Sequence, residues 1–209
     1  ILFRLVGSEM CIRDRPNQQE LDAYKTHLLS LRGLPAELKQ ALELIPADAH
    51  PMDVMRTGCS MLGNLEQEMD FEQQLHATER MLALFPAIIC YWYRFSHDGV
   101  RIKTHDNSED CIGGYFLKLL TDKAPSETHK KVMHCSLILY AEHEFNASTF
   151  AARVCASTLS DLHSCITAAI GTLRGPLHGG ANEAAMEMIQ DWQTPCLLYT
   201  SDAADDLGR

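Results

Sequence analysis

The stretch LDAYKTHLLSLRGLP, residues 21–35, shows how this chain is expected to fold. Its apolar side chains recur at intervals of three, four and three positions, at Leu21, Tyr24, Leu28 and Leu31. That spacing places them on one side of an α-helix. Gly33 is suited to end this helix, and Pro35 is suited to the first turn of the next one. The stretch therefore predicts two consecutive helices joined by a short turn.

The same helical periodicity recurs along most of the chain, whereas sustained period-two alternation is hardly seen. The sequence therefore predicts an all-α protein. A long apolar helix is expected over residues 71–95, with Pro86 splitting or kinking it near Leu84. Residues 100–111 are polar and are expected to form a loop between two helical blocks. Ser148 or Thr149 is expected to start a later helix.

Composition limits the class of protein and its partners. The 209 residues are 46% hydrophobic and 22% charged, which is the balance of an ordinary globular chain. The net charge of -10 argues against nucleic acid or an anionic membrane surface as the main partner. No apolar run is long enough to span a bilayer, so no membrane partner is expected.

The two ends of the chain are expected to be foreign to it. One DNA element, read on its two strands in shifted frames, can encode both EMCIRD at residues 9–14 and CLLYTS at residues 196–201. The element resembles the transposase adapter end of shotgun sequencing libraries. Residues 1–15 and 196–209 are therefore expected to be adapter-derived tails, and residues 16–195 to be the native insert, a fragment open at both ends.

Six cysteines lie within the insert, and none forms a CxxC pair. Most sit in apolar helical stretches, which is typical of buried reduced thiols in a cytoplasmic protein. The six are Cys59, Cys90, Cys111, Cys135, Cys155 and Cys165.

Chemistry is first indicated by LRGPLHGGANE, residues 173–183. Three glycines and a proline flank His178, which places this histidine on a tight turn just before a helix. The positive end of that helix disfavours an imidazolium, so a neutral His178 could donate a hydrogen bond to a developing oxyanion. The alternative is a surface turn with a solvated histidine.

A second candidate is YAEHEFNAS, residues 140–148, in which His143 stands between two acidic residues at an expected helix end. Carboxylates on both sides favour the protonated ring, which could bind an anionic group of a substrate. The alternative is a histidine that only stabilises the C-terminal end of a helix dipole.

Together the segments at residues 142–149 and 175–183 resemble the citrate synthase family. Residues 49–58, with His50-Pro51-Met52, are similar to the family's His-Pro-Met segment. Three further stretches look most like the 2-methylcitrate synthase branch of that family: residues 29–34, 91–97 and 112–114. The resemblance covers nearly the whole insert.

The resemblance implies a truncated all-α large helical domain over residues 16–195, from an enzyme that is usually a homodimer. Such enzymes condense an acyl-CoA with oxaloacetate. His178 matches the catalytic histidine that stabilises the enol oxygen, and His143 matches the histidine that binds oxaloacetate. The family's second catalytic histidine, catalytic aspartate and carboxylate-binding arginines lie in motifs that do not occur in this sequence. The fragment is therefore expected to be inactive alone.

The branch implies propionyl-CoA as co-substrate, 2-methylcitrate and CoA as products, and a role in propionate catabolism. The alternative within the family is acetyl-CoA and citrate, in the tricarboxylic acid cycle. Since the two substrates differ by one methyl group, some cross-reactivity is expected. No cofactor is implied beyond the CoA ester itself.

Three other classes of protein fit the sequence less well. The histidine and cysteine spacings fit no zinc signature and include no HExxH, so no metal site is expected. No cysteine lies in a glycine-rich turn, which argues against a Cys–His nucleophile. A non-catalytic helical interaction module would explain the helices and the acidity, but it gives no reason for the two flanked histidines.

Overall fold

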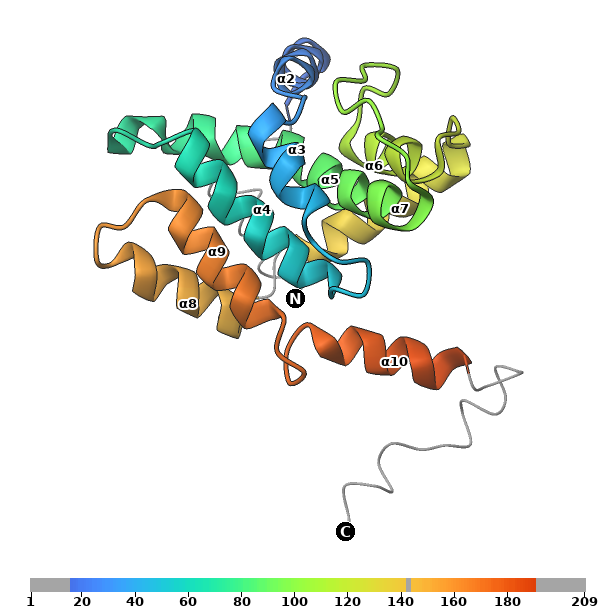
Figure 1. Ribbon diagram of the computed structural model, residues 1–209. Helices are drawn as coiled ribbons and strands as arrows, with labels where there is room; N and C mark the ends of the chain where they lie inside the picture. The colour runs from blue at the N-terminus through green and yellow to red at the C-terminus, as the bar shows by residue number, and fades with distance from the viewer. Residues whose placement is uncertain (1–15, 142–143, 191–209) are drawn as a thin grey trace. The chain divides into compact units, whose positions relative to one another are not determined.

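A computed structural model of the chain describes residues 16–141 and 144–190. The chain divides into two compact units, of which unit 1 ends at His143 and unit 2 begins at Glu144. All regular elements of the described residues are helical, which confirms the all-α prediction (Figure 1). No helix among these residues has the length and apolar character that a membrane crossing requires.

Unit 1 holds the following helices: α2 (Gln18–Ser30), α3 (Ala36–Glu43), α4 (Pro51–Leu65), η1 (Phe71–Gln73), α5 (Gln74–Asp98), α6 (Ile112–Thr121) and α7 (Glu127–Tyr140). Unit 2 holds α8 (Ala147–Ala156), α9 (Leu162–Leu173) and α10 (Gly180–Gln190).

The first two helices form as expected. Asn17 begins α2 with a capping box, in which its side chain accepts from the Glu20 backbone and Glu20 accepts in return. Gly33 lies in the turn after α2 with a φ of 107°, a left-handed conformation that favours glycine. Pro35 is the N-cap residue of α3, one position earlier than the first turn.

The core of unit 1 is built around α5. Leu84, Ala87 and Ile88 of this helix are completely buried, and α2, α3, α4 and α6 all contact it (Figure 1). A Cβ atom at Gly58 of α4 would lie 2.5 Å from Ile88 Cγ2, so glycine allows α4 to approach α5 closely.

Pro86 does not split α5, which runs unbroken from Gln74 to Asp98, so the expectation of a split near Leu84 was wrong. The alternative, a kink, stays a prediction. Leu84, Ala87 and Ile88, on both sides of the proline, are fully buried. Their packing compensates for the backbone hydrogen bond that proline cannot donate.

The polar segment between α5 and α6 is folded firmly onto unit 1. The buried Arg32 guanidinium donates from Nη1 to the carbonyl oxygens of Asp106 and Glu109, both at 2.7 Å. The same guanidinium lies 3.8 Å above the centre of the Tyr115 ring, and the Tyr115 hydroxyl donates to the Thr104 carbonyl. This loop is therefore part of the core of unit 1.

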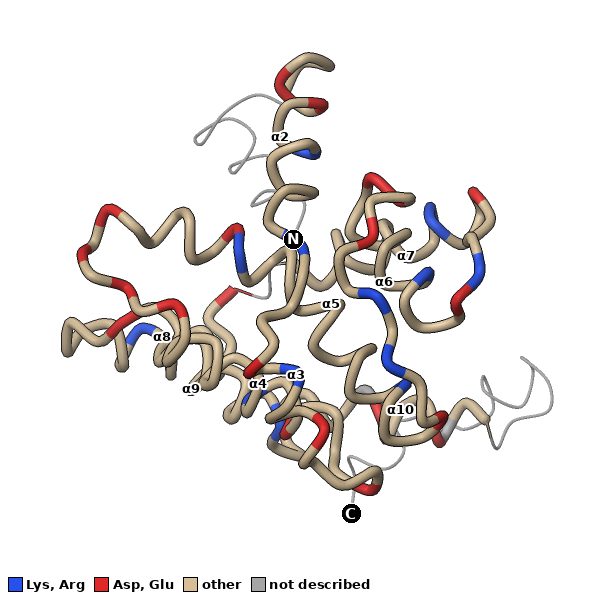
Figure 2. The backbone as a smooth tube through the Cα atoms, turned by 45° about the horizontal axis from the view of Figure 1, so that its top comes forward, with Lys and Arg blue, Asp and Glu red and all other residues tan. Residues whose placement is uncertain are grey.

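Unit 1 pairs many of its charged residues. Lys130 of α7 lies 2.7 Å from the buried Glu109 carboxylate, and Arg80 binds Glu66 at 2.6 Å. Figure 2 shows Lys and Arg residues interspersed with Asp and Glu along this unit.

Unit 2 consists of the packed pair α8 and α9, followed by α10 (Figure 1). Asn146 is the N-cap residue of α8, so the expected start at Ser148 or Thr149 was two or three residues late. Asp161 caps α9 by accepting from the Ser164 backbone N–H at 2.9 Å.

None of the six insert cysteines, all of which lie within the described residues, forms a disulfide. Cys59, Cys90 and Cys165 are buried, as expected, and burial raises the pKa of the Cys90 thiol to about 12. Cys135 on α7 is exposed, which differs from the expectation of a buried thiol.

Candidate functional site

The turn that carries His178 is closed by backbone hydrogen bonds onto the end of α9. Gly179 N donates to the Leu173 carbonyl at 2.9 Å, and His178 N donates to the Gly175 carbonyl at 3.0 Å. A Cβ atom at Gly179 would lie 2.3 Å from the Leu173 carbonyl oxygen. Only glycine therefore fits this position without a backbone shift.

His178 stands two residues before the start of α10 and is half-buried. The expectation of a histidine on a tight turn before a helix is confirmed.

The second part of the site is the N-terminus of α8. Glu144 has a φ of 58°, in the left-handed region that non-glycine residues rarely adopt. Asn146 then accepts at Oδ1 from the Thr149 backbone N–H, at 2.9 Å. The Ser148 hydroxyl donates to the same Oδ1 at 2.6 Å. The segment EFNAST therefore enters α8 through a cap in which one amide oxygen holds two donors.

His178 and Ser148 bring the two segments together. His178 Nε2 lies 3.0 Å from Ser148 Oγ, across 30 positions of sequence. The two motifs quoted from the sequence thus meet within unit 2, at the end of α9 and the start of α8. Nε2 is engaged by the serine, which leaves Nδ1 as the ring nitrogen that can meet a ligand.

The sequence identified His178 but missed Ser148, which it treated only as a capping residue. The available signal was the position of Ser148 inside the same motif as His143. His143 itself lies outside the described residues, and its role in binding an anionic substrate stays a prediction.

The other resembling segments serve the packing of unit 1. His50 caps α4 by accepting at Nδ1 from the Met52 backbone N–H, at 3.1 Å. A Cβ atom at Gly113 would lie 2.9 Å from Met133 Cγ of α7. These residues hold helices of unit 1 in place.

Tyr91 of α5 takes part in a polar cluster of unit 1. Its hydroxyl donates to Glu43 Oε1 at 2.7 Å, and Arg101 holds both Glu43 oxygens at 2.7 and 2.8 Å. The hydrogen bond from Arg101, aided by that from Tyr91, lowers the pKa of Glu43 to about 2. Burial, aided by the bond to Glu43, raises the pKa of Tyr91 to about 12. The cluster ties α3, α5 and the loop after α5 together.

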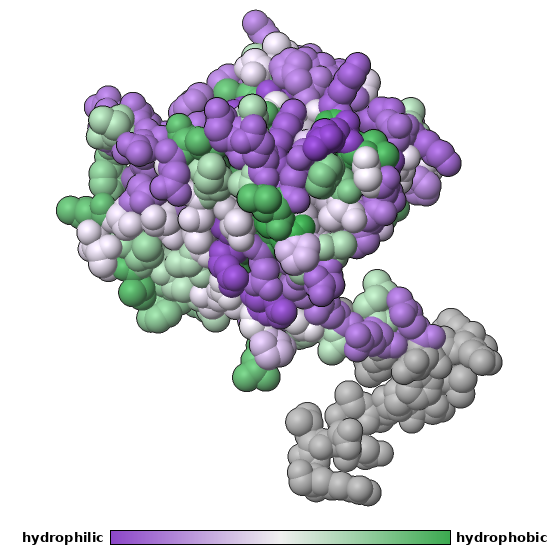
Figure 3. Space-filling view, in the orientation of Figure 1, coloured by the Kyte–Doolittle hydropathy of each residue, from purple (hydrophilic) through white to green (hydrophobic). Residues whose placement is uncertain are grey.

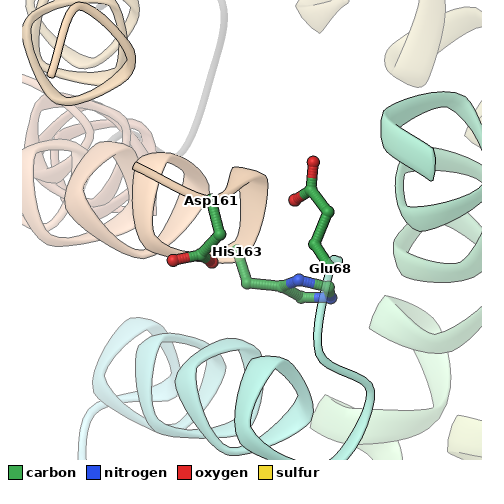
Figure 4. Close-up of side chains that lie close together, drawn as sticks. All are labelled: Glu68, Asp161 and His163. Carbon is green, nitrogen blue, oxygen red and sulfur yellow. The ribbon is translucent and has the colours of Figure 1, made fainter. Parts of the chain in front are cut away.

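Figure 4 shows Asp161 and His163 at the start of α9, where Asp161 also accepts from the Ser164 hydroxyl at 2.6 Å. Asp161 is the N-cap residue of α9. Glu68, which the same figure draws, belongs to unit 1.

Comparison with known proteins gives the family. Residues 6–206 match the family described as citrate synthase, C-terminal domain. The chain belongs to the citrate synthase family. This confirms the resemblance found in the sequence, and the all-α fold agrees with it.

Among relatives of this family member, a 2-methylcitrate synthase of Shewanella oneidensis is 72% identical over 189 residues, covering 90% of this chain and 50% of that protein. A citrate/2-methylcitrate synthase of Bacillus subtilis is 38% identical over 182 residues, covering 86% and 48%. The chain thus spans about half the length of the curated relatives it matches.

The fold of the chain is also similar to solved structures of citrate synthases. A ternary complex of Thermoplasma acidophilum citrate synthase with carboxymethyl coenzyme A and oxaloacetate has a TM-score of 0.80 at 26% identity. The match covers 93% of this chain and 51% of that one. A citrate synthase of Thermotoga maritima has a TM-score of 0.73 at 31% identity, covering 90% of this chain and 49% of that one.

Proposed function

We propose that the chain is part of a 2-methylcitrate synthase, an acyltransferase that condenses propionyl-CoA with oxaloacetate to give 2-methylcitrate and CoA. The 72% identity to the Shewanella oneidensis enzyme supports the choice of branch. The observation that carries the proposal is the contact between His178 and Ser148, since it joins the two motifs typical of the family at one place.

In this reaction His178 stabilises the enol form of the acyl-CoA. Loss of an α-proton from a thioester moves negative charge onto the carbonyl oxygen, and a hydrogen bond aimed at that oxygen lowers the barrier. A neutral histidine supplies such a bond without donating a full proton. The turn fixes His178 through Gly179, and Ser148 fixes the orientation of its ring.

His143 binds oxaloacetate in this proposal, through a protonated ring that pairs with a substrate carboxylate. The second catalytic histidine, the catalytic aspartate and the carboxylate-binding arginines belong to the part of the enzyme outside residues 16–195. Those residues form part of the large helical domain, so turnover requires the longer protein.

The remaining features of the proposal concern the chain as a whole. Residues 1–15 and 196–209 are adapter-derived, the enzyme is a cytoplasmic homodimer, and it uses no metal or cofactor besides its CoA ester substrate. Resequencing the source gene tests the boundaries. Codons for EMCIRD and CLLYTS that continue the gene would contradict them.

The substrate branch is tested with the full-length gene product that contains residues 16–195. We expect a higher kcat/KM for propionyl-CoA than for acetyl-CoA, with measurable activity on both. The reverse ratio would make the protein a citrate synthase of the tricarboxylic acid cycle. The 38% identity to the dual-named Bacillus subtilis enzyme makes this second candidate worth the direct comparison.

The role of His143 is tested on the same protein by thermal unfolding with and without oxaloacetate. Oxaloacetate should raise the Tm by binding the folded state, and His143→Ala should abolish that rise. His129→Ala, at an exposed position of α7, is the matched control and should retain it. No effect of oxaloacetate on the unsubstituted protein would favour a non-catalytic helical module.

A further inference from the structure

The Ser148 hydroxyl stands between two acceptors and has only one proton to donate. Asn146 Oδ1 lies 2.6 Å from Ser148 Oγ, and His178 Nε2 lies 3.0 Å from the same atom. A hydroxyl carries one O–H donor and two acceptor lone pairs. When the proton points to Asn146, the oxygen can only accept from His178. When it points to His178, the bond to Asn146 is lost.

This choice decides which nitrogen of His178 carries the ring proton. If Ser148 donates to Asn146, His178 must present Nε2–H to the serine, and Nδ1 is then an acceptor. If Ser148 donates to Nε2, the neutral ring carries its proton on Nδ1. The tautomer of a neutral histidine is set by the hydrogen bond that its other nitrogen makes.

We propose that Asn146 is a positioning residue that sets the tautomer of His178 through the Ser148 hydroxyl. The inference rests on the proposed function, in which Nδ1, the nitrogen not engaged by Ser148, must donate to the enol oxygen. The neutral Asn146 amide holds the serine proton when no substrate is present. When an acyl-CoA oxygen takes a donor at Nδ1, the ring loses its Nε2 proton to water and gains one from water at Nδ1. The Ser148 hydroxyl keeps its own proton and turns from Asn146 to donate to Nε2.

The identity of Asn146 matters because a carboxylate would hold the proton more strongly. Hydrogen bonds to an ionised acceptor are roughly twice as strong as those to a neutral one. Both residue types cap a helix equally well. Capping of α8 would therefore work with either asparagine or aspartate. Only the weaker acceptor, asparagine, lets the Ser148 hydroxyl turn away easily and donate to His178.

The start of α9 provides a matched site without a catalytic histidine. Asp161 accepts from the Ser164 backbone N–H at 2.9 Å and from the Ser164 hydroxyl at 2.6 Å. Asn146 of α8 accepts from the same two kinds of donor, the Thr149 backbone N–H and the Ser148 hydroxyl. An exchange of Asn and Asp can thus be made at both helix ends.

The kinetic test uses the full-length gene product and four variants: Asn146→Asp, Ser148→Ala, the double variant and Asp161→Asn. We expect Asn146→Asp to lower kcat about tenfold, the cost of one strengthened hydrogen bond, at an unchanged Tm and an unchanged KM for oxaloacetate. In the Ser148→Ala background the same substitution should cause no further loss. Asp161→Asn should leave kcat unchanged.

Two outcomes would overturn the inference. One is a wild-type kcat in Asn146→Asp. The other is an equal loss with and without Ser148, because a through-space effect of the new charge or a capping effect would not need the serine.

A second readout does not depend on turnover. The ¹⁵N shifts of the His178 ring in histidine-labelled protein, assigned by their loss in His178→Gln, report the tautomer directly. Asn146→Asp should show the Nε2–H form, and Asn146→Ala should shift the ring toward Nδ1–H. An identical tautomer in both variants would contradict the inference. Failure of the unsubstituted enzyme to use any acyl-CoA would instead contradict the proposed function.

Discussion

Unit 1 and unit 2 differ in how their helices are held. In unit 1, Leu84 and Ile88 of α5 are fully buried, and Trp92 is 2% exposed. In unit 2, Phe150 and Val154 of α8 are 68% and 51% exposed, and Leu177 of the His178 turn is fully exposed. Apolar side chains also lie among polar ones at the surface in Figure 3.

This difference shows that the geometry of the two units is fixed in two different ways. Unit 1 obtains its geometry from close packing, which resists changes of volume. The site segments of unit 2 obtain theirs from a helix cap, a glycine turn and the bond between His178 and Ser148. Substitutions in unit 1 should therefore act on stability, whereas those at the unit 2 site should act on catalysis.

The largest expected effect is on the stability of unit 1. Leu84→Ala should lower the free energy of unfolding by about 2–5 kcal/mol, because it removes a fully buried side chain and leaves a cavity. Leu82→Ala on the same helix, where the side chain is 43% exposed, should cost less than about 1 kcal/mol. Urea unfolding followed by far-ultraviolet circular dichroism measures both, and equal costs would contradict the account of the core.

The next effect concerns the turn of unit 2. Gly179→Ala adds a Cβ atom that would lie 2.3 Å from the Leu173 carbonyl oxygen. The turn must shift to relieve this clash, and the shift should displace His178. A displacement of about 1 Å costs roughly a hundredfold in kcat. Gly180→Ala is the matched control, since the nearest atom to its Cβ would be 3.4 Å away, and it should retain kcat within about threefold. The measurement is CoA release by the full-length gene product; similar losses in both variants would contradict the role of the turn.

A smaller effect is the pH dependence of unit 1. The pKa of Glu43 is lowered to about 2 from its ordinary 4.5, so its bonds to Arg101 and Tyr91 stabilise the fold fully above pH 4.5. That contribution is lost as the pH falls from 4.5 toward 2. Glu43→Gln should reduce the loss of urea midpoint over this range, whereas Glu37→Gln on the same helix should not. An unchanged pH profile in Glu43→Gln would contradict the cluster's role.

Local patterns predicted most of the fold and half of the site. The spacing of Leu21, Tyr24 and Leu28, with Gly33 after them, predicted a helix and its end because helix period and turn chemistry act over a few residues. The turn of His178 was predicted for the same reason. Its contact with Ser148 was not, because it joins positions 30 residues apart and depends on the packing of α8 against α9.

Two local expectations were wrong, one because of tertiary packing and one because a neighbouring residue caps the helix. Pro86 was expected to split or kink α5. The split does not occur, because burial of Leu84, Ala87 and Ile88 on both sides outweighs one lost hydrogen bond. The start of α8 was expected at Ser148 or Thr149, but the Asn146 side chain accepts from Thr149 N and caps the helix earlier.

The most direct measurement of the central claim is the release of CoA from propionyl-CoA and oxaloacetate by the full-length gene product carrying His178→Ala. If His178 stabilises the enol oxygen, kcat should fall by at least about a hundredfold, as for the loss of an oxyanion donor. The rise in Tm caused by oxaloacetate should remain, and His129→Ala should behave as the unsubstituted enzyme does. Turnover by His178→Ala within about threefold of that enzyme would contradict the claim.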